Sequence, residues 1–265
     1  MFPPVSPRDI PAAALATVRR WNAVEFGAMV AFLFWVVCGL SFAPFRVQPS
    51  DAYRLSWLSW TPWFIQHFVY LCLLWGDVVL IILAAVNTHF AAVRQWGRAE
   101  AVKWGVIVMV VSGILETVGT LTTYPFGPYV YTDAFGPRIG GILPITIPLA
   151  WLIVMTNFLI LVRQFIPFAS ARVQAVSVAV LATMFDFVLE PFAVYIKQYW
   201  IWLRSANDLP IPLTNYFSWW GIAFLLTLLA APQVTLRWGD TEPRSALIIV
   251  CMLAIFIVTR LAHGI

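Results

Sequence analysis

The hydrophobic residues of this chain fall into seven long, continuous runs rather than an alternating pattern. The runs cover residues of about 22–44, 60–88, 102–122, 142–166, 170–190, 216–236 and 245–262. Each run can cross a bilayer core of about 30 Å, which takes roughly 20 helical residues. The strands of a membrane barrel would need about 10 alternating residues each, and that alternation is missing. The pattern predicts an all-α polytopic membrane protein, a bundle of seven transmembrane helices.

The composition agrees with a membrane protein. Of the 265 residues, 62% are hydrophobic and 11% are charged, whereas soluble domains average about 25% charged residues. We expect a single transmembrane domain over residues 1–265, with a short soluble segment at about 1–20 and no cleavable signal peptide. Cys38, Cys72 and Cys251 all lie inside apolar runs, so we interpret them as packing residues rather than a disulfide or metal cluster.

The basic residues gather at the ends of the runs and predict an orientation. Ten Arg and Lys residues fall on the side of the N-terminus and six fall on the other side. The positive-inside rule therefore predicts a multi-pass protein of the cell (inner) membrane with a cytoplasmic N-terminus. The net charge of +4 comes mostly from these Arg residues, so it calls for no nucleic acid partner.

The acidic residues divide into two groups. Seven lie in loops or at the ends of runs, and we interpret them as solvated surface charges: Asp9, Glu25, Asp51, Glu100, Asp208, Asp240 and Glu242. Five others, Asp77, Glu116, Asp133, Asp186 and Glu190, lie within the runs or in a distinctive loop. A carboxylate at membrane depth costs on the order of a few kcal/mol unless it is paired or protonated. These five residues are therefore candidates for a structural or chemical role.

The direction of each predicted helix brings most of these acids to one end of the bundle. Glu116 lies two-thirds of the way along the third run, and Asp186 and Glu190 lie near the matching end of the fifth. Asp186 and Glu190 are four residues apart and share a helix face. Pro191 disfavours helical geometry at Glu190 and predicts that the helix ends or kinks there.

The loop PFGPYVYTDAFGPRIGG, residues 125–141, lies at the same end and carries Asp133. We therefore expect four carboxyl groups, from Glu116, Asp133, Asp186 and Glu190, to converge there. Asp77, near the middle of the second run, is a possible further acid.

Small residues surround Glu116 at helical spacing: Gly113, Gly119, Thr120 and Thr123. Such a stripe lets another helix or a flat ligand approach the carboxyl group. The alternative is a tight contact between helices with Glu116 hydrogen-bonded across it.

Aromatic residues crowd the same end: Tyr124, Tyr129, Tyr131, Tyr199, Trp200, Trp202, Tyr216, Trp219 and Trp220. A belt at the membrane interface accounts for many of them. Ring faces beside carboxyl groups would also stabilise a cationic intermediate.

Three motifs in the region of about 105–222 form a recognisable set. They are Glu116-x-x-Gly119 followed by PFGPYVY and Gly136-Pro137-Arg138; Asp186-x-x-Leu189-Glu190-Pro191; and Trp200-x-Trp202 followed by Ile211-Pro212-x-x-Asn215 and Trp219. The set resembles the membrane carotenoid hydratases. Two details depart from that family, which more often has a second Asp at the position of Glu190 and Gly-Trp where this chain has Trp219-Trp220-Gly221.

The resemblance implies addition of water across the terminal C=C of a carotenoid ψ-end group to give a tertiary alcohol. Its substrates would be of the γ-carotene, lycopene or bisanhydrobacterioruberin type, with membrane lipid and water as the other partners. We predict Glu116, Asp186 and Glu190 as catalytic residues, one donating a proton to the alkene and another accepting one from water. The predicted substrate-binding residues are Tyr124, Tyr129, Tyr131, Asp133, Trp200, Trp202, Asn215 and Trp219.

No cofactor and no metal are expected for this chemistry. A Gly-rich phosphate loop is missing from the sequence, and His67, His89 and His263 show no ligand spacing.

Three other functions remain open. A carotenoid cyclase would begin with the same protonation, but an internal alkene would capture the cation. A proton-coupled transporter also keeps buried acids, although no internal repeat is visible. A non-catalytic pigment-binding subunit is the third. A retinal protein is disfavoured, because Lys103 and Lys197 are the only lysines and neither lies in the last run.

Overall fold

The computed structural model describes residues 21–43, 59–203, 209–233 and 242–265. In this part of the chain, seven helices are long and apolar enough to cross a membrane, which confirms the predicted all-α, polytopic fold. The helices are α1 (Ala23–Phe42), α2 (Trp63–Trp96), α3 (Arg98–Thr122), α4 (Thr146–Phe165), α5 (Ala171–Pro191), α6 (Leu213–Ala230) and α7 (Pro243–His263). The predicted soluble segment 1–20 lies outside the described residues.

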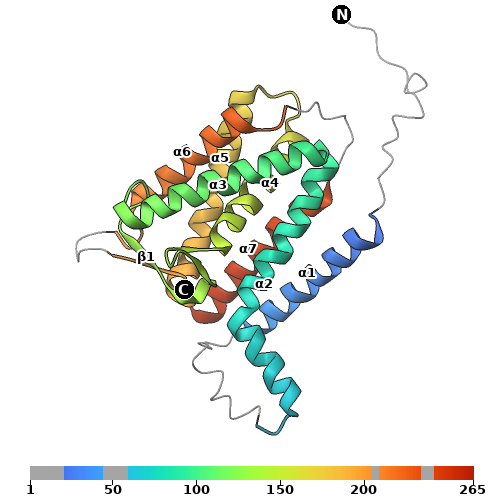
Figure 1. Cartoon of the computed structure of the whole chain (residues 1–265), viewed down its shortest axis with the longest axis vertical. Coiled ribbons are helices and arrows are strands. Elements are labelled where there is room, and N and C mark those ends of the chain that lie inside the picture. The colour runs from blue at the N-terminus through green and yellow to red at the C-terminus, as the bar shows by residue number, and fades with distance from the viewer. Residues whose placement is uncertain (1–20, 44–58, 204–208, 234–241) are drawn as a thin grey trace, which may run out of the picture.

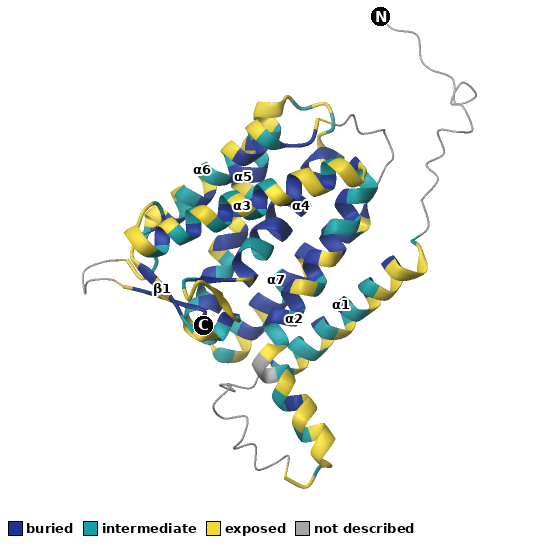
Figure 2. Ribbon diagram, in the orientation of Figure 1, coloured by how far each residue is buried: buried dark blue, intermediate teal, exposed yellow. Residues whose placement is uncertain are grey.

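Helix α4 forms the centre of the bundle, and α1 lies at its edge against α2 (Figures 1 and 2). Helix α4 is buried along most of its length, and two of its polar side chains are hydrogen-bonded to neighbouring helices. The indole of Trp104 donates to Thr156 at 3.0 Å, and the Asn157 amide donates to Thr88 at 2.8 Å. Hydrogen bonds of this kind hold membrane helices together where apolar contact alone gives little preference for protein over lipid.

Helices α2 and α3 are longer than predicted and meet at Gly97. The predicted loop after residue 88 is helical through Trp96, because the polar side chains there bond within the protein. Arg94, for example, pairs with Glu25 at 3.2 Å and with Glu242 at 3.0 Å. Gly97 has a φ of 81°, a conformation that glycine adopts without steric cost. It therefore allows the chain to reverse with a single residue between the two helices.

The α-helical part of the fifth span, α5, ends at Pro191, within one residue of the predicted position. Glu190 itself is helical, however, so the expectation that the proline disfavours helical geometry there is wrong. The chain continues as a π-helix, η6 (Phe192–Lys197), directly after the proline. Proline cannot donate a backbone hydrogen bond, and the wider π-helical turn shifts the hydrogen-bond pattern beyond it. Glu190 thus keeps helical spacing from Asp186.

Short strands cover the end of the bundle that carries the acids. Strand β1 (Tyr129–Tyr131) pairs antiparallel with β4 (Trp200–Trp202), and we call this pair the lid ribbon. The 3-10 helix η5 (Asp133–Phe135) follows β1, and a second small hairpin joins β2 (Arg138–Ile139) to β3 (Leu143–Pro144). The lid ribbon joins segments about 70 residues apart, a pairing that the hydrophobic pattern does not predict.

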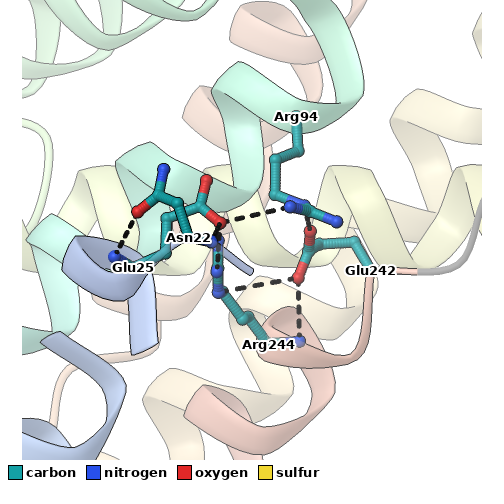
Figure 3. A network of polar contacts seen from close by, with 5 residues as sticks. All are labelled: Asn22, Glu25, Arg94, Glu242 and Arg244. Carbon is teal, nitrogen blue, oxygen red and sulfur yellow. Dashed lines mark hydrogen bonds and ion pairs between the residues drawn. The ribbon is translucent and has the colours of Figure 1, made fainter. Parts of the chain in front are cut away.

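Four charged residues form a buried network near the start of α7 (Figure 3). Arg94 lies 3.2 Å from a Glu25 oxygen and 3.0 Å from a Glu242 oxygen, and Arg244 lies 3.1 Å from Glu25. The guanidinium of Arg244 also lies 4.3 Å from the ring centroid of Trp21. The prediction that Glu25 and Glu242 are solvated surface charges is therefore wrong. Their basic partners come from distant parts of the chain and tie α1, α2 and α7 together.

Removing one member of this network should destabilise the bundle strongly. Arg244→Met leaves two buried carboxylates short of a partner, and losses of this kind cost about 3–5 kcal/mol. An SDS titration of the purified protein should show this decrease in the free energy of unfolding. Lys103→Met is the control, because Lys103 is exposed and 3.9 Å from Glu100, and exposed pairs contribute at most about 1 kcal/mol. Equal effects of the two substitutions would contradict a structural role for the network.

Candidate active site

A largely apolar cavity lies beneath the lid ribbon, enclosed by six of the helices. Three buried carboxyl groups line it, those of Glu116 from α3 and of Asp186 and Glu190 from α5, and Asp77 of α2 lines its edge. The cavity has a volume of about 80 Å³, whereas one water needs roughly 10–15 Å³. The site therefore has room for water beside an apolar group.

Glu116 is held by three hydrogen-bond donors. The hydroxyls of Tyr129 and Tyr131 donate to its Oε2 at 2.8 and 2.7 Å, and the indole of Trp151 donates to its Oε1 at 2.8 Å. An ionised carboxylate only accepts hydrogen bonds. The surroundings of Glu116 are therefore built to hold a carboxylate in one orientation.

Asp186 and Glu190 share the side-chain amide of Asn215. Its Nδ2 donates to Asp186 at 2.8 Å and to Glu190 at 3.0 Å. Glu190 also accepts from the indoles of Trp202 at 3.0 Å and Trp200 at 3.3 Å. Among the described residues, Asp186 accepts no other side-chain hydrogen bond. Two of the three carboxyl groups thus have three donors each, and Asp186 has one.

The lid ribbon supplies four of these donors through its alternation of side chains. Tyr129 is paired with Trp202, and Tyr131 with Trp200. Successive side chains of a strand point to opposite faces, so these four aromatic residues face the cavity, whereas the intervening Val130 is exposed. The tyrosines of β1 reach Glu116, and the tryptophans of β4 reach Glu190. Each strand therefore holds one carboxyl group.

The two tyrosines of the lid ribbon remain protonated donors. Burial, with the nearby Glu116 carboxyl, raises the pKa of both Tyr129 and Tyr131 above the ordinary value of a phenol. Both hydroxyls therefore keep their protons at neutral pH and can donate to Glu116.

Trp151 is a site residue that the sequence analysis missed. Its indole bonds Glu116, and its ring stacks on Trp219 with centroids 3.8 Å apart and an interplanar angle of 9°. Trp219 thus supports the Trp151 indole, which donates a hydrogen bond to Glu116. The only sequence signal was a Trp inside the fourth apolar run, which a membrane belt explains equally well.

Three predicted residues occupy other places. Tyr124 is 76% exposed and does not line the cavity. The Asp133 side chain is 87% exposed and forms an ion pair with Arg138 at 2.6 Å, so the predicted convergence of four carboxyl groups reduces to three. Asp77 lines the edge of the cavity, but its carboxylate binds Lys197 at 2.9 Å.

The small residues around Glu116 contact the chain's own loop. A Cβ added at Gly119 would lie 2.7 Å from the ring of Phe126 and 3.1 Å from the Tyr129 hydroxyl. Gly113 faces Leu143 and Pro148. Gly119 therefore admits the segment that leads into β1. This close approach allows Tyr129 to reach Glu116. Gly113 packs in part against Pro148 of the neighbouring helix α4, and Glu116 is hydrogen-bonded to Trp151 of that helix, as the alternative of a contact between helices predicted.

The chain is similar in sequence to proteins of a described family. Residues 76–264 match the family described as "Carotenoid biosynthesis protein". A 107-residue stretch is 30% identical to bisanhydrobacterioruberin hydratase of Haloarcula japonica, covering 40% of this chain and 36% of that protein. No solved structure matches the chain. The family match includes every residue named above as lining the cavity, and it extends over more than half of the sequence, so the chain belongs to the carotenoid biosynthesis protein family.

Proposed function

We propose that the protein hydrates the terminal C=C of a carotenoid ψ-end group, giving a tertiary alcohol. The proposal rests on three buried carboxyl groups around one apolar cavity. Two of them accept three side-chain hydrogen bonds each, and the third accepts one. The family match supports a role in carotenoid modification, and the partial similarity to a named hydratase supports hydration. The apolar lining suits the end of a hydrocarbon chain, and a carotenoid is about as long as the bilayer core is thick.

Asp186 is the proposed proton donor. Two negative charges four residues apart in a medium of low dielectric repel strongly, so one member of the pair holds a proton. Glu190 has three donors that favour its ionised form, whereas Asp186 has one. The proton therefore resides on Asp186. Its transfer to the less substituted carbon of the alkene forms a C–H bond and leaves the positive charge on the tertiary carbon.

Glu190 and the aromatic rings stabilise this cation, and Glu116 completes the addition. The π-faces of Trp151, Trp219 and the ribbon residues can face a positive charge inside the cavity. A water oxygen then forms the C–O bond while Glu116 accepts one of its protons. Return of that proton to Asp186, directly or through solvent, restores the starting state. The sum of these steps is the addition of one water.

Asp77 has no part in this scheme as an acid. Its carboxylate is paired with the Lys197 ammonium at 2.9 and 3.1 Å and lies at the edge of the cavity.

The product separates this proposal from a cyclase. In a host that makes lycopene, the pigment should gain the mass of one water, or of two waters if both ends react. In water enriched with oxygen-18, mass spectrometry should find the label in the new hydroxyl group. A product with the same mass as the substrate would contradict hydration and favour the cyclase.

Substitution of the three carboxyl groups tests their roles. Asp186→Asn, Glu116→Gln and Glu190→Gln nearly preserve volume but remove the acid. At least two of them should lower turnover by about a hundredfold or more, the usual scale for a lost general acid or base. Turnover is measured in membranes, together with pigment binding and the amount of inserted protein.

Glu100→Gln is the matched control for these variants. Glu100 lies on the same helix as Glu116, is partly exposed and has only a distant partner in Lys103, so this variant should act like the unmodified protein. Glu242→Gln would be a poor control, because Glu242 belongs to the buried network. If all three site variants fold and stay fully active, the carboxyl groups are structural and the mechanism is wrong.

A further inference from the structure

A second cavity lies beside the reaction cavity, between α1, α2, η6 and α7, and we call it the vestibule. Its volume is about 360 Å³. Its lining is mixed, and its polar members include Asp77, Lys197, Gln198, Thr259 and His263. The mixed lining suits water better than it suits a polyene.

The two cavities share part of their lining. Asp77, Leu80 and Ile255 contribute to both. The Asp77 carboxylate binds the Lys197 ammonium at 2.9 and 3.1 Å, and Tyr199, which lines the reaction cavity, lies near Asp77. Polar groups therefore continue from the vestibule to the wall of the reaction cavity.

The reaction cavity needs such a connection. Hydration consumes one water per turnover, and the hydrocarbon core of a membrane contains almost none. The lid ribbon closes the cavity with four aromatic side chains that are already bonded to carboxyl groups. On the side that borders the vestibule, Asp77, which is paired with Lys197, forms part of the wall of the reaction cavity.

We propose that the vestibule delivers the water that captures the carbocation, and that the Asp77–Lys197 ion pair marks the junction where this water passes. The inference rests on the proposed hydration. Water supply decides the fate of the cation, because a cation that meets no water loses a proton instead. Loss of the proton just gained restores the substrate, and loss of a proton from another neighbouring carbon gives an isomeric alkene. The ratio of alcohol to isomer therefore reports on the route.

Gly76 offers a way to fill the vestibule without altering the acids. It lines the vestibule next to Asp77, and a Cβ added there meets no heavy atom within 4 Å. Gly76→Phe should therefore place a ring in the vestibule. The alcohol should decrease by about a hundredfold, the scale expected when a reactant is no longer in position, while the isomeric product increases. Gly221→Phe is the matched control, because Gly221 also has open space around it and lines neither cavity.

A second variant tests the same route in protein that has already folded. Gly76→Cys is made with Cys38→Ser, Cys72→Ser and Cys251→Ser, and the membranes are treated with a charged methanethiosulfonate reagent. Such a reagent reacts with thiols in contact with water and does not dissolve in lipid. The introduced thiol should react, and its modification should lower the ratio of alcohol to isomer, whereas the unmodified variant should keep it.

The outcomes separate this inference from the proposed function. If the unmodified protein yields no alcohol, hydration itself is wrong. If the unmodified protein hydrates and Gly76→Phe or the modified thiol variant does so at the same rate, the vestibule is not the route. An unreactive thiol at position 76 would also overturn the inference, because the vestibule would then contain no water. Should Gly76→Phe fail to insert, the thiol variant decides alone.

Discussion

The cost of burying carboxyl groups among apolar side chains governs the arrangement of this protein. A charge removed from water into a medium of low dielectric must be neutralised, paired or surrounded by donors. Glu116 and Glu190 are surrounded by donors, Asp77 is paired with Lys197, and Glu25 and Glu242 are paired with arginines. The hydrogen-bond donors and basic partners of these carboxyl groups are positioned by the lid ribbon, the bend at Gly97 and the start of α7.

The seven helices could be predicted because an apolar run of about 20 residues has few alternatives in a membrane. Polar residues were harder to interpret. Asn87 and Thr88 seemed to end a span and are instead bonded inside it. Glu25 and Glu242 seemed to be surface charges, because their nearness to Arg94 and Arg244 depends on how helices far apart in sequence pack together.

Candidate site residues could be placed from the sequence where their position follows from the direction of a helix. Glu116, Asp186 and Glu190 lie on regular helices, so their depth follows from their position along each span. Asp133 and Tyr124 lie in a loop, where depth does not follow from sequence position. Trp151 could not be separated from an ordinary membrane tryptophan, because its distinguishing feature is a contact with a residue 35 positions away.

The pairing of β1 with β4 links the two carboxylates mechanically. Tyr129 and Tyr131 hold Glu116 from one strand, while Trp200 and Trp202 hold Glu190 from the other. Because the strands are joined by backbone hydrogen bonds, a displacement of the pair withdraws donors from both carboxylates together. A movement that opened the ribbon would therefore change the surroundings of Glu116 and Glu190 at the same time.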